Sequence, residues 1–287
     1  MATLMLFFDG VGIGENDPST NPFSAIGARR LGVVAGGTTG NGAGLVALDA
    51  GLGVPGLPQS ATGQTTLLTG VNASQLCGQH RVGLPGPTLW PVLQKESLFL
   101  KLKQAGKRPT FANAYTREHL EAKRPRWSAS TRAVKAAGLP FRMWDKEGLA
   151  GKALFHDYTG EWPRRRGYTM REHDAASAAT VLCELLEDHD FVLYEYFLTD
   201  LAAHRGTWQD KLEQARRVEA LVDEVLRRLD PGKHRVVVTS DHGNLEAGDH
   251  KRHTFNPVPL LVWGQNRDRL LARVTAMTDV TPALVRA

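Results

Sequence analysis

Short apolar runs alternate along the chain with longer stretches of helical character. Four runs have the length of buried β-strands: residues 4–8, 191–197, 235–240 and 258–263. Residues 208–229 place apolar side chains on one helical face and charged ones on the other, residues 175–187 are also helix-like, and Ser60 can open a helix. This alternation predicts an α/β fold, a three-layer α/β/α sandwich whose helices cover both faces of a sheet.

The middle of the chain has a different composition. Between Lys101 and Lys135, ten lysines and arginines stand against two acidic residues, and residues 164–166 are three consecutive arginines. We therefore expect residues 1–88 and 173–287 to form the core. Residues 89–172 would form a small inserted basic cap that closes over the substrate.

Composition narrows the class of protein. The 42% of hydrophobic and 23% of charged residues are ordinary for a folded globular protein and argue against a disordered chain. No stretch supplies the roughly 20 apolar residues that cross a bilayer, and the first residues lack the basic segment and cleavage site of a secretory leader. We therefore expect a cytoplasmic protein. The net charge of +5 favours anionic partners.

Carboxylates follow three of the predicted strands. Asp9, Asp200 and Asp241 each come shortly after such a strand. Sheets of this class place their ligands outside the carboxyl ends of the strands, so these aspartates lie where a site is expected.

Histidines accompany two of these carboxylates. His204 follows Asp200 by four residues, a spacing that lets both reach one ion from a helical turn, although such pairs also occur on surfaces without function. His242 follows Asp241 directly, and His253 lies nearby before two prolines. Three carboxylates and three imidazoles suit Mn²⁺ or Zn²⁺, with Mg²⁺ as a further candidate. The set is large enough for two ions if one more anionic ligand is present.

Ser60 is the candidate for that ligand. A hydroxyl at a helix N-terminus faces unpaired N–H groups and the positive end of the helix dipole, which favour phosphate and alkoxide. A nearby metal ion would activate the hydroxyl as a nucleophile. The alternative is that Ser60 serves only as the N-cap of the helix.

The order of these motifs resembles the alkaline phosphatase superfamily. The shared elements are Asp-Gly after the first strand, S-x-x-G at a helix start, Asp-x-x-x-His, Asp-His-Gly-Asn and His-Thr-x-Asn-Pro-Val-Pro. The chain most resembles the branch of the cofactor-independent phosphoglycerate mutases and phosphopentomutases, over residues 1–88 and 173–287. The resemblance implies two metal sites, one held by Asp9, Ser60, Asp241 and His242 and the other by Asp200, His204 and His253. It also implies that Ser60 is the nucleophile between them.

A second branch of the superfamily places the nucleophile at the same position of the sequence. In nucleotide pyrophosphatases the nucleophile stands ten residues before the glycine of a T-L-x-T-G motif, and Ser60 stands ten residues before Gly70. This comparison selects Ser60 over Thr62 and Thr65. One position departs from the family, because Gln64 stands where these branches usually have histidine.

The short middle segment bears on the reaction. A mutase must retain its dephosphorylated product while phosphate sits on the serine, which demands an elaborate cap. About 80 residues make a mutase less favoured, so we expect a hydrolase of small phosphate mono- or diesters that forms a phosphoserine. A phosphomutase is the first alternative.

Two further classes were weighed. A degenerate core that binds nucleic acid through its basic charge is disfavoured, because aromatic residues do not interleave with the basic run. A sulfatase-like enzyme is disfavoured because neither Cys77 nor Cys183 lies in the required motif. We expect a small phosphorylated substrate, with candidate contacts from these residues: Asn16, Arg117, Lys123, Arg124, Arg126, Arg132 and Asn256.

Overall fold

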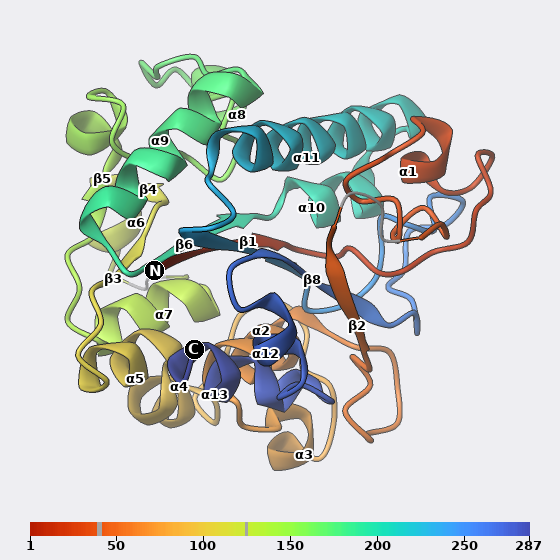
Figure 1. The fold of residues 1–287 in the computed structure, drawn as a ribbon, viewed down its shortest axis with the longest axis horizontal. Helices are drawn as coiled ribbons and strands as arrows, with labels where there is room; N and C mark the ends of the chain where they lie inside the picture. The colour runs from red at the N-terminus through yellow and green to blue at the C-terminus, as the bar shows by residue number, and fades with distance from the viewer. Residues whose placement is uncertain (39–41, 124–125) are drawn as a thin grey trace.

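A mixed β-sheet crosses the middle of the molecule (Figure 1). The computed structural model describes residues 1–38, 42–123 and 126–287. Within these residues the sheet has six strands in the order β2-β8-β7-β1-β6-β3. Their bounds are β1 Ala2–Phe8, β2 Gly44–Leu48, β3 Pro109–Phe111, β6 Phe191–Tyr196, β7 His234–Thr239 and β8 Val258–Gly264. Strands β3, β6, β1 and β7 are parallel, whereas β8 and β2 are antiparallel to their neighbours.

The central strand shows why the sheet is covered on both faces. Leu4, Leu6 and Phe8 of β1 join one hydrophobic core, and the intervening Met5 and Phe7 join the other. Successive side chains of a strand point to opposite faces, so a strand that is apolar at every position has to be buried on both. The apolar run at the start of the chain therefore specifies the centre of a three-layer structure.

Helices form the two outer layers (Figure 1). One layer contains α1 (Pro22–Ala25), α9 (Ala175–Asp188), α10 (Leu198–Arg205) and α11 (Trp208–Arg228). The other contains α2 (Ser60–Thr69), α3 (Ala73–Cys77), α4 (Trp90–Glu96), α5 (Leu98–Gln104), α7 (Ala129–Ala136), α12 (Arg267–Leu271) and α13 (Val280–Val285). The predicted α/β class is confirmed, and each predicted strand and helix is found to within two residues of its expected ends.

The segment that the sequence assigned to the cap is partly built into the core. Strand β3 pairs in parallel with β6 at the edge of the main sheet, and α5 and α7 contribute Phe99 and Val134 to the core beneath it. The boundary near residue 89 stays a prediction, and β3, α5 and α7, which lie beyond it, pack in the core through apolar side chains that stand among basic surface residues. Its remaining elements are β4 (Ala114–Tyr115), β5 (Arg142–Met143), α6 (Arg117–Leu120), α8 (Glu161–Arg164) and a π-helical turn at Trp144–Gly148.

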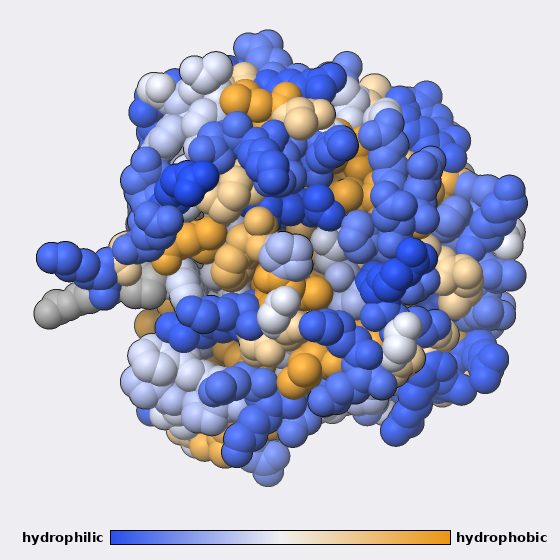
Figure 2. Space-filling model, turned by 90° about the vertical axis from the view of Figure 1, so that its left-hand side faces the viewer, coloured by the Kyte–Doolittle hydropathy of each residue, from blue (hydrophilic) through white to orange (hydrophobic). Residues whose placement is uncertain are grey.

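The outside of the molecule is mostly polar. Figure 2 shows a face on which hydrophilic residues frame a broken band of hydrophobic ones. Among the described residues, no helix combines the length and the apolar character that crossing a membrane requires.

Candidate metal centre and adjoining cavity

The sheet register brings the first two carboxylates together. Phe7 of β1 lies beside Thr239 of β7, so Asp9 and Asp241, each two residues further on, emerge side by side. Asp200 joins them from α10, which starts after the neighbouring strand β6. The hydroxyl of Thr199 donates to the Asp9 carbonyl at 2.6 Å and ties this helix to the end of β1. The three aspartates therefore meet because three neighbouring parallel strands end at one edge.

Two glycines permit the close packing of these segments. A Cβ on Gly63 would lie 2.7 Å from the Asp241 carbonyl oxygen, and one on Gly10 would lie 2.6 Å from an Asp200 carboxylate oxygen. Gly10 also has a φ of +69°, which side chains rarely tolerate. The Gly of S-x-x-G thus lets helix α2 approach the loop that carries Asp241.

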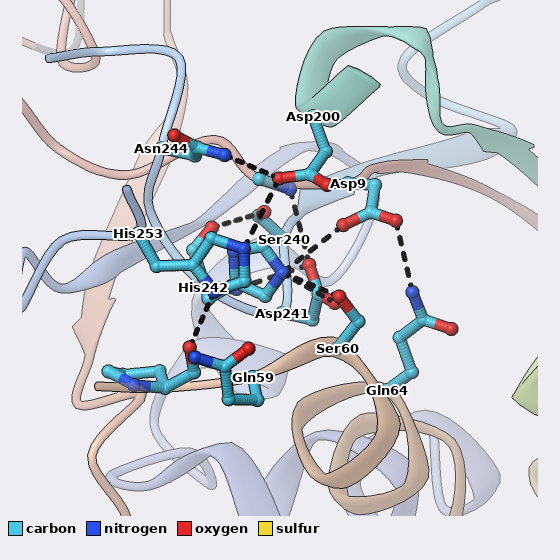
Figure 3. A network of polar contacts seen from close by, with 12 residues as sticks. Asp9, Gln59, Ser60, Gln64, Asp200, Ser240, Asp241, His242, Asn244 and His253 are labelled. Carbon is cyan, nitrogen blue, oxygen red and sulfur yellow. Dashed lines mark hydrogen bonds and ion pairs between the residues drawn. The ribbon is translucent and has the colours of Figure 1, made fainter. Parts of the chain in front are cut away.

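Ser60 is the first residue of α2 and faces the cluster. Its Oγ lies 3.0 Å from His242 Nε2 (Figure 3). Gln59, not Ser60, is the N-cap residue, so the alternative reading of Ser60 as a cap is wrong. Thr62 and Thr65 instead donate to backbone carbonyls of their own helix. Unlike the hydroxyls of Thr62 and Thr65, that of Ser60 therefore contacts a residue of the cluster.

The unprotonated ring nitrogens of His204 and His253 face one another. Nδ1 of His204 lies 2.9 Å from the Lys251 carbonyl oxygen, and Nδ1 of His253 lies 2.7 Å from that of Pro58. Because only an N–H can bond to a carbonyl, each neutral ring keeps its lone pair on Nε2. These Nε2 atoms lie 2.9 Å apart and 3.4 to 3.6 Å from oxygens of Asp200. Two facing acceptors beside a carboxylate fit a cation, and the carbonyls hold the rings as metal ligands are usually held.

The other half of the cluster carries excess negative charge. Oδ1 of Asp9 and Oδ2 of Asp241 are buried without a hydrogen-bond partner among the described residues. They lie 3.3 and 3.4 Å from Nε2 of His242, whose Nδ1 faces the Gly243 carbonyl. Orphaned carboxylate oxygens around an imidazole form a donor set that suits a divalent ion.

The pKa shifts of these residues reflect the same excess of buried negative charge. Burial, followed by the charges of Asp241 and Asp200, raises the pKa of Asp9 well above its usual value. Burial by itself would lower the pKa of His242, but the carboxylates of Asp241 and Asp9 raise it to about 10. Burial and the neighbouring His242 lower the pKa of His253 to about 4, which keeps that ring neutral. Bound cations would supply the positive charge that the buried carboxylates lack.

The predicted core-site residues other than His204 are labelled together in Figure 3, and Nε2 of His204 lies 2.9 Å from Nε2 of His253. Within the described residues, two groups place their ligand atoms close enough to hold an ion: Asp200 with His204 and His253, and Asp200 with Asp9 and His242. Asp200 therefore reaches both groups, whereas the expected ligand sets gave it to one.

Gln64 and Glu246 form hydrogen bonds with the cluster or with the segments that carry it. Gln64 donates from Nε2 to Oδ2 of Asp9 at 3.1 Å, so the residue that departs from the family orients a predicted ligand. Buried Glu246 accepts hydrogen bonds from the backbone of Gly12 and Asn244 and from two side chains near His253. Glu246 is not among the residues predicted from the sequence, although it stands two residues after the Asp-His-Gly-Asn motif.

A cavity of about 420 Å³ opens beside the cluster. Its metal side is formed by Asp9, Ser60, Gln64, Asp200 and His204. Its second wall, termed the cap-side wall, is formed by Tyr115, His119, Arg126, Ser128, Thr131, His156 and Glu195. Apart from Arg126, these residues are not among those predicted from the sequence, because each is a single polar residue outside any motif.

Most of the predicted substrate contacts lie elsewhere. Asn16 is exposed and accepts a hydrogen bond from Ser24, and Asn256 donates to Glu246. Arg117 pairs with Asp145, and Arg132 lies over the ring of Trp90. Of the candidates within the described residues, Arg126 is the one that lines the cavity. Lys123 is exposed and does not line it. Arg124 falls outside the described residues.

Comparison with known proteins identifies the family. A family model described as the metalloenzyme superfamily matches residues 1–286. The chain belongs to this superfamily. The resemblance to alkaline phosphatase-like enzymes that the motifs indicated is thereby confirmed.

The similar curated proteins are phosphoglycerate mutases. The 2,3-bisphosphoglycerate-independent phosphoglycerate mutase of Methanopyrus kandleri is 35% identical over 95 residues, which cover 32% of this chain and 22% of that protein. The corresponding mutase of Pyrococcus abyssi is 28% identical over 166 residues, covering 58% of this chain and 36% of that protein. The matched regions thus span only about a fifth to a third of these relatives.

Solved structures share the fold across the whole chain. The PH0037 protein from Pyrococcus horikoshii superposes with a TM-score of 0.59 at 13% identity, covering 100% of this chain and 98% of that one. A cold-active alkaline phosphatase from a Shewanella species gives 0.55 at 12% identity, covering 100% and 99%. At these identities the likeness establishes an alkaline phosphatase-like fold.

Proposed function

We propose that this protein is a metal-dependent phosphohydrolase that cleaves a small phosphate mono- or diester through a phosphoserine at Ser60. The position of the Ser60 hydroxyl carries the proposal. It lies at the N-terminus of a ten-residue helix, 3.0 Å from His242, and it lines the cavity beside both candidate ligand groups. Unpaired N–H groups at a helix start favour the anionic oxygens of a phosphate.

The donor set fits two divalent ions. Asp9, Asp241 and His242, with Ser60, would hold one ion, and Asp200, His204 and His253 the other. Mn²⁺ and Zn²⁺ match carboxylate and imidazole ligands best, and Mg²⁺ is a further candidate. When bound, such ions neutralise the oxygens of the phosphate and lower the pKa of a nearby hydroxyl.

The reaction of the chain itself has two steps. Ser60 loses its proton to solvent, and its Oγ attacks phosphorus as the ester P–O bond breaks. The departing oxygen takes a proton from water and leaves as an alcohol. A water molecule then attacks phosphorus in the covalent intermediate and restores the Ser60 hydroxyl. A monoester substrate thereby releases inorganic phosphate, and a diester releases a phosphate monoester. The buried carboxylates and rings hold these groups in line, and positioning of this kind supplies most of the catalysis in phosphoryl transfer.

A phosphomutase is the second candidate. The curated relatives are named as phosphoglycerate mutases, which favours return of the phosphoryl group to the same molecule. The two candidates differ in product, because hydrolysis releases inorganic phosphate and a mutase yields a phosphate isomer instead. In either case we propose a cytoplasmic enzyme whose partner is a small phosphorylated molecule rather than a nucleic acid.

The variant Ser60→Ala tests the proposal. Turnover of a panel of phosphate mono- and diesters should fall about a thousandfold or more, because the attacking oxygen is removed. Bound metal, measured by elemental analysis, should persist at the Asp200 group. Ser177→Ala removes a hydroxyl from the first turn of α9 and serves as the matched control. Full activity of Ser60→Ala would end the assignment of the nucleophile.

A further inference from the structure

The cap-side wall contains a buried pair of polar side chains that the proposed phosphoryl transfer does not use. Glu195 of β6 and His156 both line the catalytic cavity, and their side chains are 3% and 14% exposed. Oε2 of Glu195 and Nδ1 of His156 are 3.9 Å apart. Polar groups buried to this degree normally have partners, so their hydrogen bonds show what they can still offer to a ligand.

Asn113 fixes the orientation of this pair. Its Oδ1 accepts from the backbone N–H of Glu195 at 2.9 Å, and its Nδ2 donates to the backbone carbonyl of Glu195 at 2.7 Å. A backbone N–H can only donate and a carbonyl can only accept, so the amide of Asn113 has one possible orientation.

The same amide sets the tautomer of His156. Nδ2 of Asn113 also lies 3.1 Å from Nδ1 of His156, and since Nδ2 is a donor, Nδ1 must accept. Burial lowers the pKa of His156 to about 3, which keeps the ring neutral. The proton of a neutral ring with an accepting Nδ1 is on Nε2. His156 therefore offers an N–H donor to the cavity.

Glu195 offers the complementary acceptor. The hydroxyl of Ser130 donates to its Oε2 at 2.5 Å, and within the described residues no protein group bonds to its Oε1. Hydroxyl contacts continue from Ser130 to Ser128 and then to Thr131 and Tyr115, which stiffens this wall. An acceptor and a donor thus lie on the same wall of the cavity, on two side chains whose Oε2 and Nδ1 atoms are 3.9 Å apart.

Resting on the proposed function, we infer that Glu195 and His156 bind a hydroxyl group of the substrate. A hydroxyl can donate to the carboxylate and accept from the imidazole N–H at once, whereas most other groups satisfy one of the two. The substrate class is therefore the phosphate ester of a polyhydroxy alcohol, such as glycerol or a sugar.

The pair disfavours two other kinds of phosphate ester. Above about pH 7, where Glu195 is ionised, a carboxylate on the leaving group would face its negative charge and be repelled. An ammonium group could pair with Glu195, but it has only donors and cannot accept the hydrogen bond that the N–H of His156 offers. The inference therefore separates this protein from enzymes that recognise acidic phosphate esters such as phosphoglycerate.

A matched series of substrates tests the inference. Values of kcat/KM are measured with the metal-loaded wild-type protein on glycerol 1-phosphate, propyl phosphate, 3-phosphoglycerate and phosphoethanolamine. Glycerol phosphate should exceed propyl phosphate about tenfold or more, because hydrogen bonds to a charged group discriminate by at least that factor. A preference for 3-phosphoglycerate or phosphoethanolamine would overturn the inference.

Variants of Glu195 and His156 test whether these two residues cause the preference for glycerol phosphate. In Glu195→Gln, which keeps its size and can still accept from Ser130, the ratio of glycerol phosphate to propyl phosphate should fall about tenfold. His156→Phe should lower the same ratio while retaining the ring beside Phe197. The exposed Glu187→Gln is the control and should leave the ratio unchanged. Equal loss on both substrates, or loss of bound metal in Glu195→Gln, would assign Glu195 a structural or metal-binding role instead.

Binding separates this inference from the proposed function. If the wild-type protein hydrolyses neither these four esters nor any member of the panel of phosphate mono- and diesters, the proposed function fails. Calorimetry with the Ser60→Ala protein then compares glycerol 1-phosphate with propyl phosphate directly. If the Ser60→Ala protein binds glycerol 1-phosphate more tightly than propyl phosphate, and adding Glu195→Gln removes that difference, the hydroxyl site is supported independently of catalysis. Equal affinities for the two esters overturn it.

Discussion

The two walls of the catalytic cavity satisfy their polar groups in different ways. On the metal side, carboxylate oxygens of Asp9 and Asp241 have no hydrogen-bond partner in the described residues, and two imidazole nitrogens face each other at 2.9 Å. On the cap-side wall, Asn113 and Ser130 hold Glu195 and His156 in hydrogen bonds within the protein. The metal side therefore fits cations from outside. On the cap-side wall the protein bonds Oε2 of Glu195 and Nδ1 of His156, and it leaves Oε1 and the Nε2 proton for a neutral ligand.

Under the proposed function, this difference gives the chemistry to one wall and the recognition of the substrate to the other. Unbalanced charge in a buried place is costly unless an ion compensates it, so the metal side is built for binding and activation. Satisfied polar groups are rigid and discriminate between ligands by the bonds that remain open. Changes on the metal side should therefore affect turnover most, and changes on the cap-side wall should affect choice of substrate and pH response.

The largest effect is expected from Asp200→Asn. Asp200 reaches both candidate ligand groups, so its loss weakens both. We expect turnover to fall about a thousandfold or more, because several kcal/mol of charge stabilisation are removed. Elemental analysis should show less than the wild-type metal content, and exposed Asp188→Asn is the control. Wild-type metal content together with wild-type turnover would show that this cluster is not the metal centre.

A smaller effect is expected in the pH dependence of stability. Burial, opposed by the hydrogen bond from Ser130 and assisted by Asp241, raises the pKa of Glu195 from 4.5 to about 7. The folded protein thus holds a proton that the unfolded chain releases between these values. Stability from this group is present below pH 4.5 and is lost as the pH rises to about 7, by at most about 3 kcal/mol.

Urea unfolding of the metal-free protein measures this loss. Between pH 4.5 and 7 the wild-type free energy of unfolding should decline relative to that of Glu195→Gln, because glutamine does not titrate. The other carboxylates are common to both proteins and cancel in the difference. Parallel curves over this range would show that Glu195 titrates at its ordinary pKa and is not desolvated.

The smallest effect is expected at the rim of the cavity. Arg126 is exposed and lines the cavity, so Arg126→Ala should raise KM about threefold for an anionic ester with little change in kcat. Added salt should erase the difference, since it screens exposed charges. Lys123→Ala, which alters an exposed charge that does not line the cavity, should have no effect. An equal effect of both variants would mean that overall charge, not position, attracts the substrate.

Prediction from sequence succeeded for residues in motifs and failed for isolated ones. Asp9, Asp200 and Asp241 follow parallel strands that end at one edge of the sheet, so their meeting could be anticipated. His204 and His242 stand close behind two of these aspartates, and His253 lies in a motif that precedes β8. Arg117 and Arg132 are predicted as substrate contacts from their charge alone. In the structure Arg117 forms an ion pair with Asp145, and the guanidinium of Arg132 lies over the ring of Trp90. Their charge was visible in the sequence, but their neighbours were not.

The sequence by itself determined the layers, the strand ends and the hydroxyl at the start of α2. These follow from short-range patterns, namely apolar runs, helical spacing and glycine at close approaches. Tertiary structure alone decided that Asp200 reaches both ligand groups, that β3 belongs to the main sheet, and that Asn113 orients Glu195 and His156. Asn113 and Glu195 are 82 residues apart, and no local pattern encodes a hydrogen bond over that separation. The folded chain sets such contacts through the packing of whole elements.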